Sequence, residues 1–209
     1  MSSKSDKKNP YLIGVTGSFG AGKTLVGQIL TDMGYKVLDT DSIVANILKT
    51  KNTITSEIVN NFGDEITNSD TSIGYINKTQ LADIVFSDES KLKKLESIIH
   101  PEVKNQIKLF VFNNSSHSII FVLVPLLFEA HMEKNYNETW CIICDDKKRL
   151  ERAMQKGILD SDVKRRIASQ LPQDVKAKKV DYVIDNSQDE SNTKNQIVKR
   201  LDEIKVAMN

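Results

Sequence analysis

The chain has 209 residues, of which 39% are hydrophobic and 27% are charged, a composition that excludes a disordered or fibrous protein. Its 29 Lys and Arg residues nearly balance its 28 Asp and Glu residues, and the net charge of +1 excludes a general attraction to nucleic acid or anionic membranes. The longest apolar run, residues 119–128, is shorter than the ~20 residues of a membrane helix.

The first ten residues are polar and carry lysines, so we interpret residues 1–10 as a flexible leader and not as a secretory signal. Without such a signal, and with only two cysteines, the protein is expected in the reducing cytoplasm.

Cys141 and Cys144 match C-x-x-C, which is also found in redox pairs and zinc sites. Residues three apart in a strand point to opposite faces, and no second Cys/His pair completes a metal site, so we expect two buried strand residues.

The first predicted elements alternate between strand and helix. Residues 11–16 form an apolar run stopped by glycines, which is typical of a buried parallel strand. Apolar residues at helical spacing predict a helix over 23–33, closed by Gly34. Residues 35–38 read as a second strand, and a helix begins at Asp41, where the helix dipole favours an acidic side chain.

The remaining chain continues this alternation after a helical interruption. Residues 52–114 lack a strong core strand and include helices at 81–86 and 91–99, with Pro101 opening a further helix. Three buried strands follow at 119–124, 139–144 and 182–184, with helices at 147–156, 161–170 and 193–208. Strands that alternate with helices predict an α/β fold whose parallel sheet is covered on both faces.

One motif carries the functional prediction. Residues 17–24 match G-x-x-x-x-G-K-[ST] in full, between a predicted strand and a predicted helix. Glycines let backbone N–H groups face phosphate oxygens, the lysine brings charge to the β- and γ-phosphates, and the threonine hydroxyl is a Mg²⁺ ligand. A glycine-rich turn with a solvated lysine is the alternative, which this context disfavours. The predicted triphosphate-binding residues are Gly17, Ser18, Phe19, Gly20, Ala21, Gly22, Lys23 and Thr24.

Missing motifs narrow the class of P-loop protein. A GTPase needs N-K-x-D, and residues 77–80 read Asn-Lys-Thr-Gln. A motor ATPase carries a Mg²⁺-binding aspartate at the end of its central strand, whereas the strand at 119–124 runs into Pro125. These absences favour a kinase.

Asp39 and Asp41 follow the second predicted strand, at the carboxyl end where ligands of open α/β sheets bind. A carboxylate there can accept the proton of an attacking hydroxyl. The alternative is that one of the two caps the following helix. We expect one base and one cap or partner of a Mg²⁺-bound water, and the residues alone leave open which is which.

Cations on two consecutive predicted helices suggest a lid. Arg152 and Lys156 are four residues apart and share a helix face, where they could neutralise charge on a transferring phosphoryl group. The alternative is a solvated helix that pairs with Glu151 and Asp160, and spacing does not decide between the two. The cations are Arg149, Arg152, Lys156, Arg165 and Arg166.

Several segments carry a resemblance to a known family. They are Gly-Val-Thr-Gly at 14–17, Val-Leu-Asp-Thr-Asp at 37–41, Ile-Val-Phe-Ser at 84–87, Lys-Leu-Lys-Lys-Leu-Glu-Ser-Ile-Ile-His-Pro at 91–101, Val-Pro-Leu-Leu-Phe-Glu at 124–129, Arg-Ala-Met-Gln-Lys at 152–156, Arg-Ile-Ala-Ser-Gln at 166–170 and Asp-Tyr-Val-Ile-Asp-Asn at 181–186. In this order they resemble the dephospho-CoA kinase family over residues 12–186. The I-H-P and P-L-L-F-E segments are the most specific.

The resemblance implies a single P-loop kinase domain over 11–209, with a three-layer core around a five-stranded parallel sheet, a helical acceptor-binding insertion at about 52–114 and a lid at about 146–178. It implies that ATP, with Mg²⁺, phosphorylates the ribose 3′-hydroxyl of dephospho-CoA, and that the partners are these small molecules, without nucleic acid or membrane. The implied catalytic residues are Asp41 as base, Lys23 and Arg152. The implied ATP contacts beyond the loop are Arg152, Lys156 and Asn186, and the implied acceptor contacts are Asp41, His100, Pro125, Leu126, Leu127 and Glu129.

Two positions depart from the family pattern, and a third residue, His100, has two interpretations. Ala45 stands where the family usually has an arginine near the acceptor, and Lys156 stands where arginine is frequent, without the planar fork that grips phosphate. His100 is interpreted as orienting a turn or the substrate, in preference to a catalytic acid, because Asp41 already supplies the base. Ala45 keeps two alternatives open: a kinase for a nucleoside, nucleotide or sugar, and an ATP-binding protein with weak hydrolysis. The oligomeric state is not predicted.

Overall fold

The structure, a computed structural model, describes residues 9–70, 72, 74–155, 167 and 170–208. The chain divides into two compact units, one formed by residues up to Asp39 and from Asn114 onward, the other by Thr40–Asn113. We call them the sheet unit and the helical unit. No helix in the described ranges is long and apolar enough to cross a membrane.

The sheet unit is built on a parallel sheet that, in the described residues, has five strands in the order β2-β3-β1-β4-β5. The predicted α/β fold with five parallel strands is thereby confirmed, with strand ends shifted by at most one residue because pairing with neighbours sets them. The central strand is β1, and Val15 lies opposite Leu123 on one side and Trp140 on the other. The strands are β1 (Tyr11–Gly17), β2 (Lys36–Asp39), β3 (Ile119–Leu123), β4 (Glu138–Ile143) and β5 (Tyr182–Asp185).

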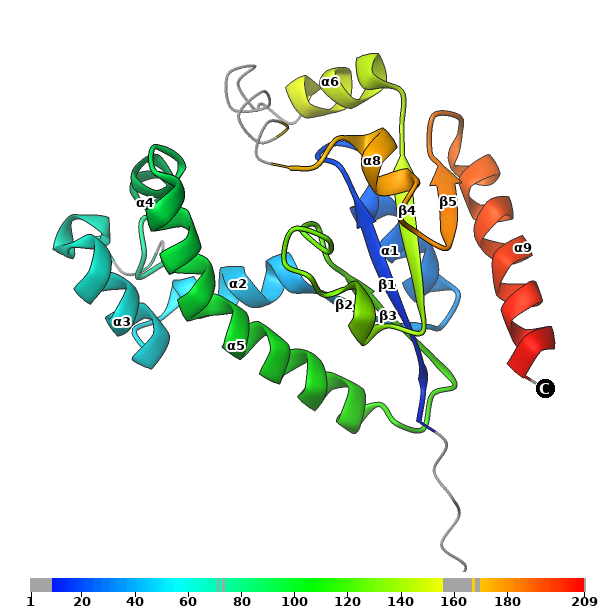
Figure 1. Cartoon of the computed structure of the whole chain (residues 1–209), viewed down its shortest axis with the longest axis horizontal. Helices are drawn as coiled ribbons and strands as arrows, with labels where there is room; N and C mark the ends of the chain where they lie inside the picture. The colour runs from blue at the N-terminus through cyan, green and yellow to red at the C-terminus, as the bar shows by residue number, and fades with distance from the viewer. Residues whose placement is uncertain (1–8, 71, 73, 156–166, 168–169, 209) are drawn as a thin grey trace, which may run out of the picture. The chain divides into compact units, whose positions relative to one another are not determined.

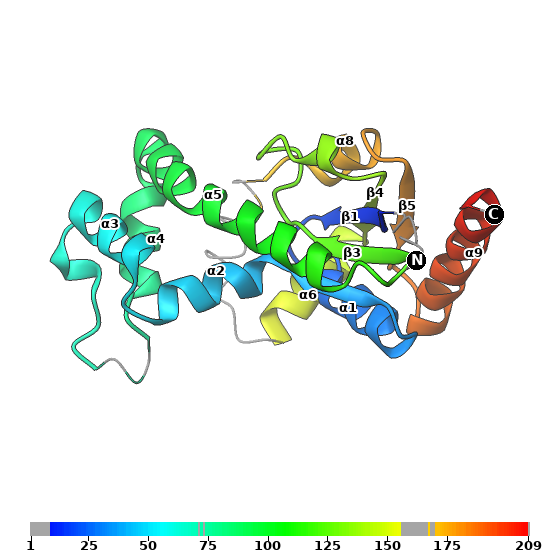
Figure 2. The same ribbon diagram turned by 90° about the horizontal axis from the view of Figure 1, so that it is seen from below.

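Helices cover both faces of this sheet (Figures 1 and 2). Helix α1 (Lys23–Asp32) and helix α9 (Glu190–Met208) share one apolar core with the strands, to which Leu30 and Leu201 contribute fully buried side chains. The short α8 (Gln173–Ala177) lies on the opposite face, and α6 (Asp146–Gln155) follows β4 at the carboxyl ends of the strands. The sequence did not predict α8, because its buried residue is a lysine, Lys176, and not an apolar side chain.

The centre of the core is aromatic and carries one buried carboxylate. Phe121 and Trp140 pack edge to face, with ring centroids 5.3 Å apart. Glu138 Oε1 accepts hydrogen bonds from Trp140 Nε1 at 2.5 Å and from Arg200 Nε at 2.8 Å. These bonds satisfy a buried charge and attach α9 to β4.

The helical unit has its own core. Ile58, Ile66 and Ile76 are almost completely buried there, which gives the unit an apolar centre that does not depend on the sheet. Two asparagines begin helices: Asn52 forms a capping box with Thr55, and Asn77 Oδ1 accepts bonds from the first-turn N–H groups. The helices are α2 (Thr40–Lys49), α3 (Thr53–Phe62), α4 (Lys78–Phe86) and α5 (Glu89–Asn113), with a 3₁₀ turn η1 (Asp64–Ile66).

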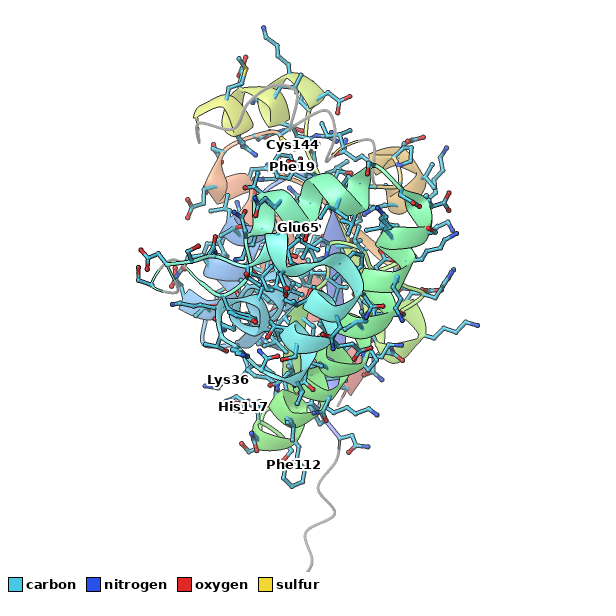
Figure 3. The ribbon with its side chains drawn as sticks, turned by 90° about the vertical axis from the view of Figure 1, so that its left-hand side faces the viewer. Phe19, Lys36, Glu65, Phe112, His117 and Cys144 are labelled. Atoms are coloured by element: carbon cyan, nitrogen blue, oxygen red, sulfur yellow. The ribbon has the colours of Figure 1, made fainter. Side chains whose placement is uncertain are left out.

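The prediction that Pro101 opens a separate helix is wrong, since α5 runs through it. Proline removes one N–H donor from a helix interior, which ordinarily ends or kinks the helix. Here Ile99 and Val103 on either side of Pro101 are buried in the same core, and this packing holds both halves as one helix. The far end of α5 carries the exposed Phe112, whose side chain points away from the fold (Figure 3).

Candidate active site

The predicted phosphate loop lies between β1 and α1, at the carboxyl end of the central strand. Gly20 and Gly22 adopt positive φ angles of 79° and 107°, which L-residues with a side chain rarely adopt. Space is also restricted, because a Cβ on Gly22 would lie 2.0 Å from Asn186 Nδ2 and one on Gly20 would lie 3.0 Å from the carbonyl oxygen of Arg149. Gly22, the second glycine of the motif, and Gly20, at one of its variable positions, are therefore both needed for the shape of the loop.

The start of α1 is suited to binding an anion. Its N-cap is Gly22, no side chain caps the first turn, and the first turn contains no acidic residue. The N–H groups of a helix start have no intrahelical partners, and the helix dipole adds positive potential there. Lys23 Nζ donates to the carbonyl oxygen of Gly17 at 2.5 Å, which places the ammonium over the loop, and Thr24 is exposed at the same end.

Asn186, predicted to contact ATP, supports the loop from behind. Its side chain is buried, its Nδ2 donates to the carbonyl oxygen of Ala21 at 2.8 Å, and its Oδ1 accepts from Thr193 Oγ1 at 2.9 Å. Both ends of the carboxamide are thus used within the protein. Thr193, in the first turn of α9, was missed because a threonine at a helix start is ordinary in sequence.

Arg152, on α6, reaches the same region. Its Nη2 donates to the carbonyl oxygen of Asn186 at 3.2 Å, and its Nη1 lies 3.4 Å from Cys144 Sγ. The guanidinium lies 3.8 Å from the position that a Cβ on Gly22 would take, so Arg152 is a neighbour of the phosphate loop. Lys156, Arg165 and Arg166 lie outside the described residues.

Arg149, on the same helix as Arg152, is buried and not solvated. Its Nη1 lies 3.3 Å from Asp146 Oδ1 and 3.4 Å from Gln173 Oε1, and its backbone faces Gly20. The Arg149 charge is paired with Asp146, which neither interpretation of this helix included. Arg149 therefore forms part of the wall behind the phosphate loop.

The two cysteines flank the end of β4. Both are free and buried, and burial raises the pKa of the Cys141 thiol to about 11, so this thiol is protonated at neutral pH and a poor nucleophile. Phe19 on the loop and Cys144 after β4 lie at the same end of the sheet (Figure 3). Cys141 lies in β4 as expected, whereas Cys144 was also expected in the strand but follows its last residue. The Cys144 sulfur accepts a hydrogen bond from Arg152.

A glutamine that the prediction did not include touches the loop directly. Gln170 Oε1 accepts the backbone N–H of Phe19 at 3.0 Å. The next residue, Leu171, donates its N–H to Glu129 Oε1 at 2.8 Å. The only signal in the sequence was that Gln170 ends one of the resembling segments.

The predicted acceptor segment, residues 125–129, is mostly turned inward. Pro125 and Leu127 are buried, and the carbonyl oxygen of Pro125 accepts from Thr16 Oγ1 at 3.1 Å and from Lys176 Nζ at 2.8 Å. Glu129 pairs with the same lysine. Leu126 is half-buried, and together with Glu129 it is the more accessible part of the segment.

The two candidate bases differ in their local structure. Asp39 is the last residue of β2 and lies opposite Leu123 of β3, whereas Asp41 is exposed in the first turn of α2. The boundary between the two compact units falls between them, at Thr40. Ala45 is half-buried further along α2.

His100 lies within α5 and is half-buried. Burial lowers its pKa below the usual value, the Glu96 carboxylate opposes this shift, and Lys104 adds to it. The unfolded chain therefore takes up this proton at a higher pH than the folded chain does. Stability associated with His100 is complete above about pH 6.5 and is lost as the pH falls toward the folded pKa.

We expect the free energy of unfolding in urea to decrease between about pH 7.5 and 5.5, and to decrease less in His100→Gln, which cannot titrate there. Circular dichroism across urea titrations at both pH values measures the difference. Equal decreases in both proteins would contradict the assignment of this pH dependence to His100.

Comparison with known proteins gives a consistent result. Residues 11–192 match the family model for dephospho-CoA kinase. A dephospho-CoA kinase from Aquifex aeolicus is 35% identical over 192 residues, covering 92% of this chain and 96% of that protein. One from Carboxydothermus hydrogenoformans is 34% identical over 190 residues, covering 90% and 91%.

Solved structures agree with this match. A Thermus thermophilus protein superposes with a TM-score of 0.82 at 29% identity, covering 93% of this chain and 97% of that one. A dephospho-CoA kinase from Campylobacter jejuni superposes with a TM-score of 0.66 at 26% identity, covering 95% and 98%. A shikimate kinase from Acinetobacter baumannii, at 16% identity, a TM-score of 0.52 and coverage of 95% and 94%, shares the fold alone.

Proposed function

The chain belongs to the dephospho-CoA kinase family, and we propose how its residues transfer the γ-phosphate of ATP to the ribose 3′-hydroxyl of dephospho-CoA. The observation that carries the proposal is the complete phosphate loop, residues 17–24, with Gly20 and Gly22 at positive φ, inside the range that the family model matches. The products are coenzyme A and ADP.

The loop binds the nucleotide through its backbone. In this proposal the N–H groups between Gly20 and Thr24 donate to the phosphate oxygens, and the N-terminus of α1 adds its dipole. Lys23 exchanges its bond to the carbonyl oxygen of Gly17 for phosphate oxygens and neutralises charge that develops on the γ-phosphoryl group. Asn186 holds the loop at Ala21 and contributes to ATP binding through that support.

The side chains near the loop fit the Mg²⁺ of a kinase. Among the described residues there is no cluster of three or more His, Cys, Asp or Glu side chains that could hold a metal ion by itself. In kinases Mg²⁺ keeps several waters and takes only one or two protein ligands besides phosphate oxygens, so a single hydroxyl from the exposed Thr24 is a suitable donor. Bound Mg²⁺ would offset negative charge on the β- and γ-phosphates.

Asp41 is the proposed base. The 3′-oxygen attacks the γ-phosphorus as the bond to the β-γ bridging oxygen breaks, the hydroxyl proton passes to the Asp41 carboxylate, and ADP leaves. Its position two residues after β2, at the carboxyl ends of the strands, supports this role. Asp39, inside the strand, is proposed as a partner of a Mg²⁺-bound water.

Arg152 and Lys156 are proposed as cations that face the triphosphate from the lid, residues 146–178. Arg152 is held by the carbonyl oxygen of Asn186 and by Cys144 Sγ, which keeps its guanidinium beside the loop. An arginine in this position can bind two phosphate oxygens at once. The role of Lys156 stays a prediction.

The proposed acceptor contacts of the sheet unit are Leu126 and Glu129, with Pro125 and Leu127 supporting them from the interior, and His100 is the proposed contact of the helical unit. Residues 52–114, which lie almost wholly within the helical unit, stay proposed as the acceptor-binding insertion. Two free cysteines support placing the enzyme in the reducing cytoplasm.

An acceptor panel tests this function. With MgATP, we expect kcat/KM for dephospho-CoA to exceed that for AMP, adenosine, shikimate and gluconate by at least ~100-fold, since a site that hydrogen-bonds its substrate discriminates strongly. ADP release with mass spectrometry of the product gives the measurement, and a Lys23→Ala preparation controls for contaminating kinases. Equal rates with nucleoside monophosphates would favour another small-molecule kinase, and ADP without a phosphorylated product would favour weak hydrolysis.

A further inference from the structure

A buried ion pair joins the last residue of the proposed acceptor segment to α8, and the phosphoryl-transfer steps above do not use its charges. The side chain of Lys176 is 0% exposed, and its Nζ lies 2.9 Å from Glu129 Oε1 and 2.8 Å from the carbonyl oxygen of Pro125. A buried ammonium is costly unless it is both paired and hydrogen-bonded. Lys176 meets both conditions, and its two partners are the first and last residues of the segment 125–129.

This ammonium connects that segment to the phosphate loop by two routes. In the first, the carbonyl oxygen of Pro125 also accepts from Thr16 Oγ1 at 3.1 Å, and Thr16 directly precedes Gly17 of the loop. In the second, Glu129 Oε1 accepts the N–H of Leu171 at 2.8 Å, and the preceding residue, Gln170, accepts the N–H of Phe19. The loop, the acceptor segment and the end of the lid therefore meet at one charge pair.

The orientation of Glu129 separates this role from substrate binding. Its Oε1 receives both Lys176 and Leu171, and its Oε2 is buried, with no hydrogen-bond partner among the described residues. The carboxylate is thus directed into the protein. A group that only contacted substrate would not need a fully buried lysine behind it.

We propose that Lys176 and Glu129 are a positioning pair, which fixes the acceptor segment 125–129 and residues Gln170 and Leu171 at a set distance from the phosphate loop. The inference rests on the proposed function, in which this segment lies against the acceptor. Displacing reacting groups by about 1 Å costs on the order of 10²-fold in rate. The N–H groups between Gly20 and Thr24, and Lys23, are not part of this pair, so we expect nucleotide binding to be retained without it.

Two variants and a matched control test the proposal. Lys176→Met leaves the Glu129 carboxylate buried without its cation, which destabilises the fold. The double variant Lys176→Met/Glu129→Gln removes both charges, and the glutamine oxygen can still accept the N–H of Leu171, so its stability should recover. The control is Lys178→Met directly after the same helix, because the side chain of Lys178 is 80% exposed and its ion-pair partner, Asp174, is 3.9 Å away.

For the double variant we expect a thermal midpoint close to that of the wild type, with kcat for dephospho-CoA lower on the order of 10²-fold. Its affinity for a non-hydrolysable ATP analogue, measured by calorimetry, should change by less than about twofold, because the loop amides and Lys23 remain. Lys178→Met should match the wild type in all three measurements.

Recovery of kcat together with stability in the double variant would overturn the proposal, because a purely structural pair predicts that result. Failure of the proposed function would be seen separately, as wild-type and Lys178→Met proteins that do not phosphorylate dephospho-CoA. In that case the same ratio of double variant to control is measured with whichever acceptor the panel identifies.

Discussion

Replacing Lys23 by alanine is expected to lower kcat by about 10³-fold. The ammonium lies over the loop, 2.5 Å from the carbonyl oxygen of Gly17. From there it can neutralise the negative charge that develops on the transferring phosphoryl group. Water molecules in the alanine variant would replace the ammonium poorly, because they must reorient as the charge develops, whereas the ammonium is already in place. Steady-state ADP release at saturating MgATP and dephospho-CoA gives kcat directly.

The control for this prediction is Lys23→Arg. Arginine keeps the positive charge but carries it on a wider planar group, so partial activity is expected, between those of the wild type and the alanine variant. Circular dichroism should show that both variants are folded, since Lys23 is half-buried at the start of α1 and not part of the core. An alanine variant within tenfold of wild-type kcat would exclude the proposed role of Lys23.

Replacing Asp41 by asparagine is expected to lower kcat by 10²- to 10⁴-fold, the usual contribution of a general base. Asparagine has nearly the same shape but cannot take up the proton of the 3′-hydroxyl. Asp41 is exposed in the first turn of α2 and is not part of either apolar core, so the variant should stay folded. Calorimetry with an ATP analogue should give an affinity within about twofold of wild type, because the phosphates are held by the loop.

Asp39→Asn is the matched control, since Asp39 is the other carboxylate of the pair and ends β2. Under the proposal it lowers kcat less than Asp41→Asn does and shifts the dependence of the rate on Mg²⁺ concentration. The reverse order of effects would assign the base to Asp39. Unchanged turnover in both variants would mean that neither carboxylate accepts the proton.

The contacts around the loop change how its predicted residues are understood. Asn186 and Arg149 were grouped with the ligand-binding or lid residues, yet Asn186 holds the loop backbone at Ala21 and Arg149 packs behind Gly20. Arg152 stays beside Gly22 with its guanidinium hydrogen-bonded. The loop is thus shaped in advance by side chains from α6 and from the end of β5, which reduces the ordering that nucleotide binding requires.

Local patterns were sufficient for most of the secondary structure. The apolar runs of β1, β3 and β4 are buried on both faces, so hydrophobicity alone marks them, and the glycines after β1 break the pattern where the loop begins. The prediction erred at Pro101, where burial of Ile99 and Val103 outweighs the lost N–H donor. The prediction missed α8, because this helix has only five residues and its buried residue, Lys176, is not apolar.

The sequence by itself determined the phosphate loop, because the motif is contiguous and each residue type has one chemical reason to be there. It also determined the five-stranded parallel sheet, through the alternation of apolar strands with helices. Only the tertiary structure brought Lys176 and Thr16 to the two ends of the segment 125–129, because these three parts of the chain are far apart in sequence and meet through hydrogen bonds that no periodicity records. A buried charge is tolerated only where distant segments supply its partners, so its place in the fold cannot be read from its neighbours in sequence.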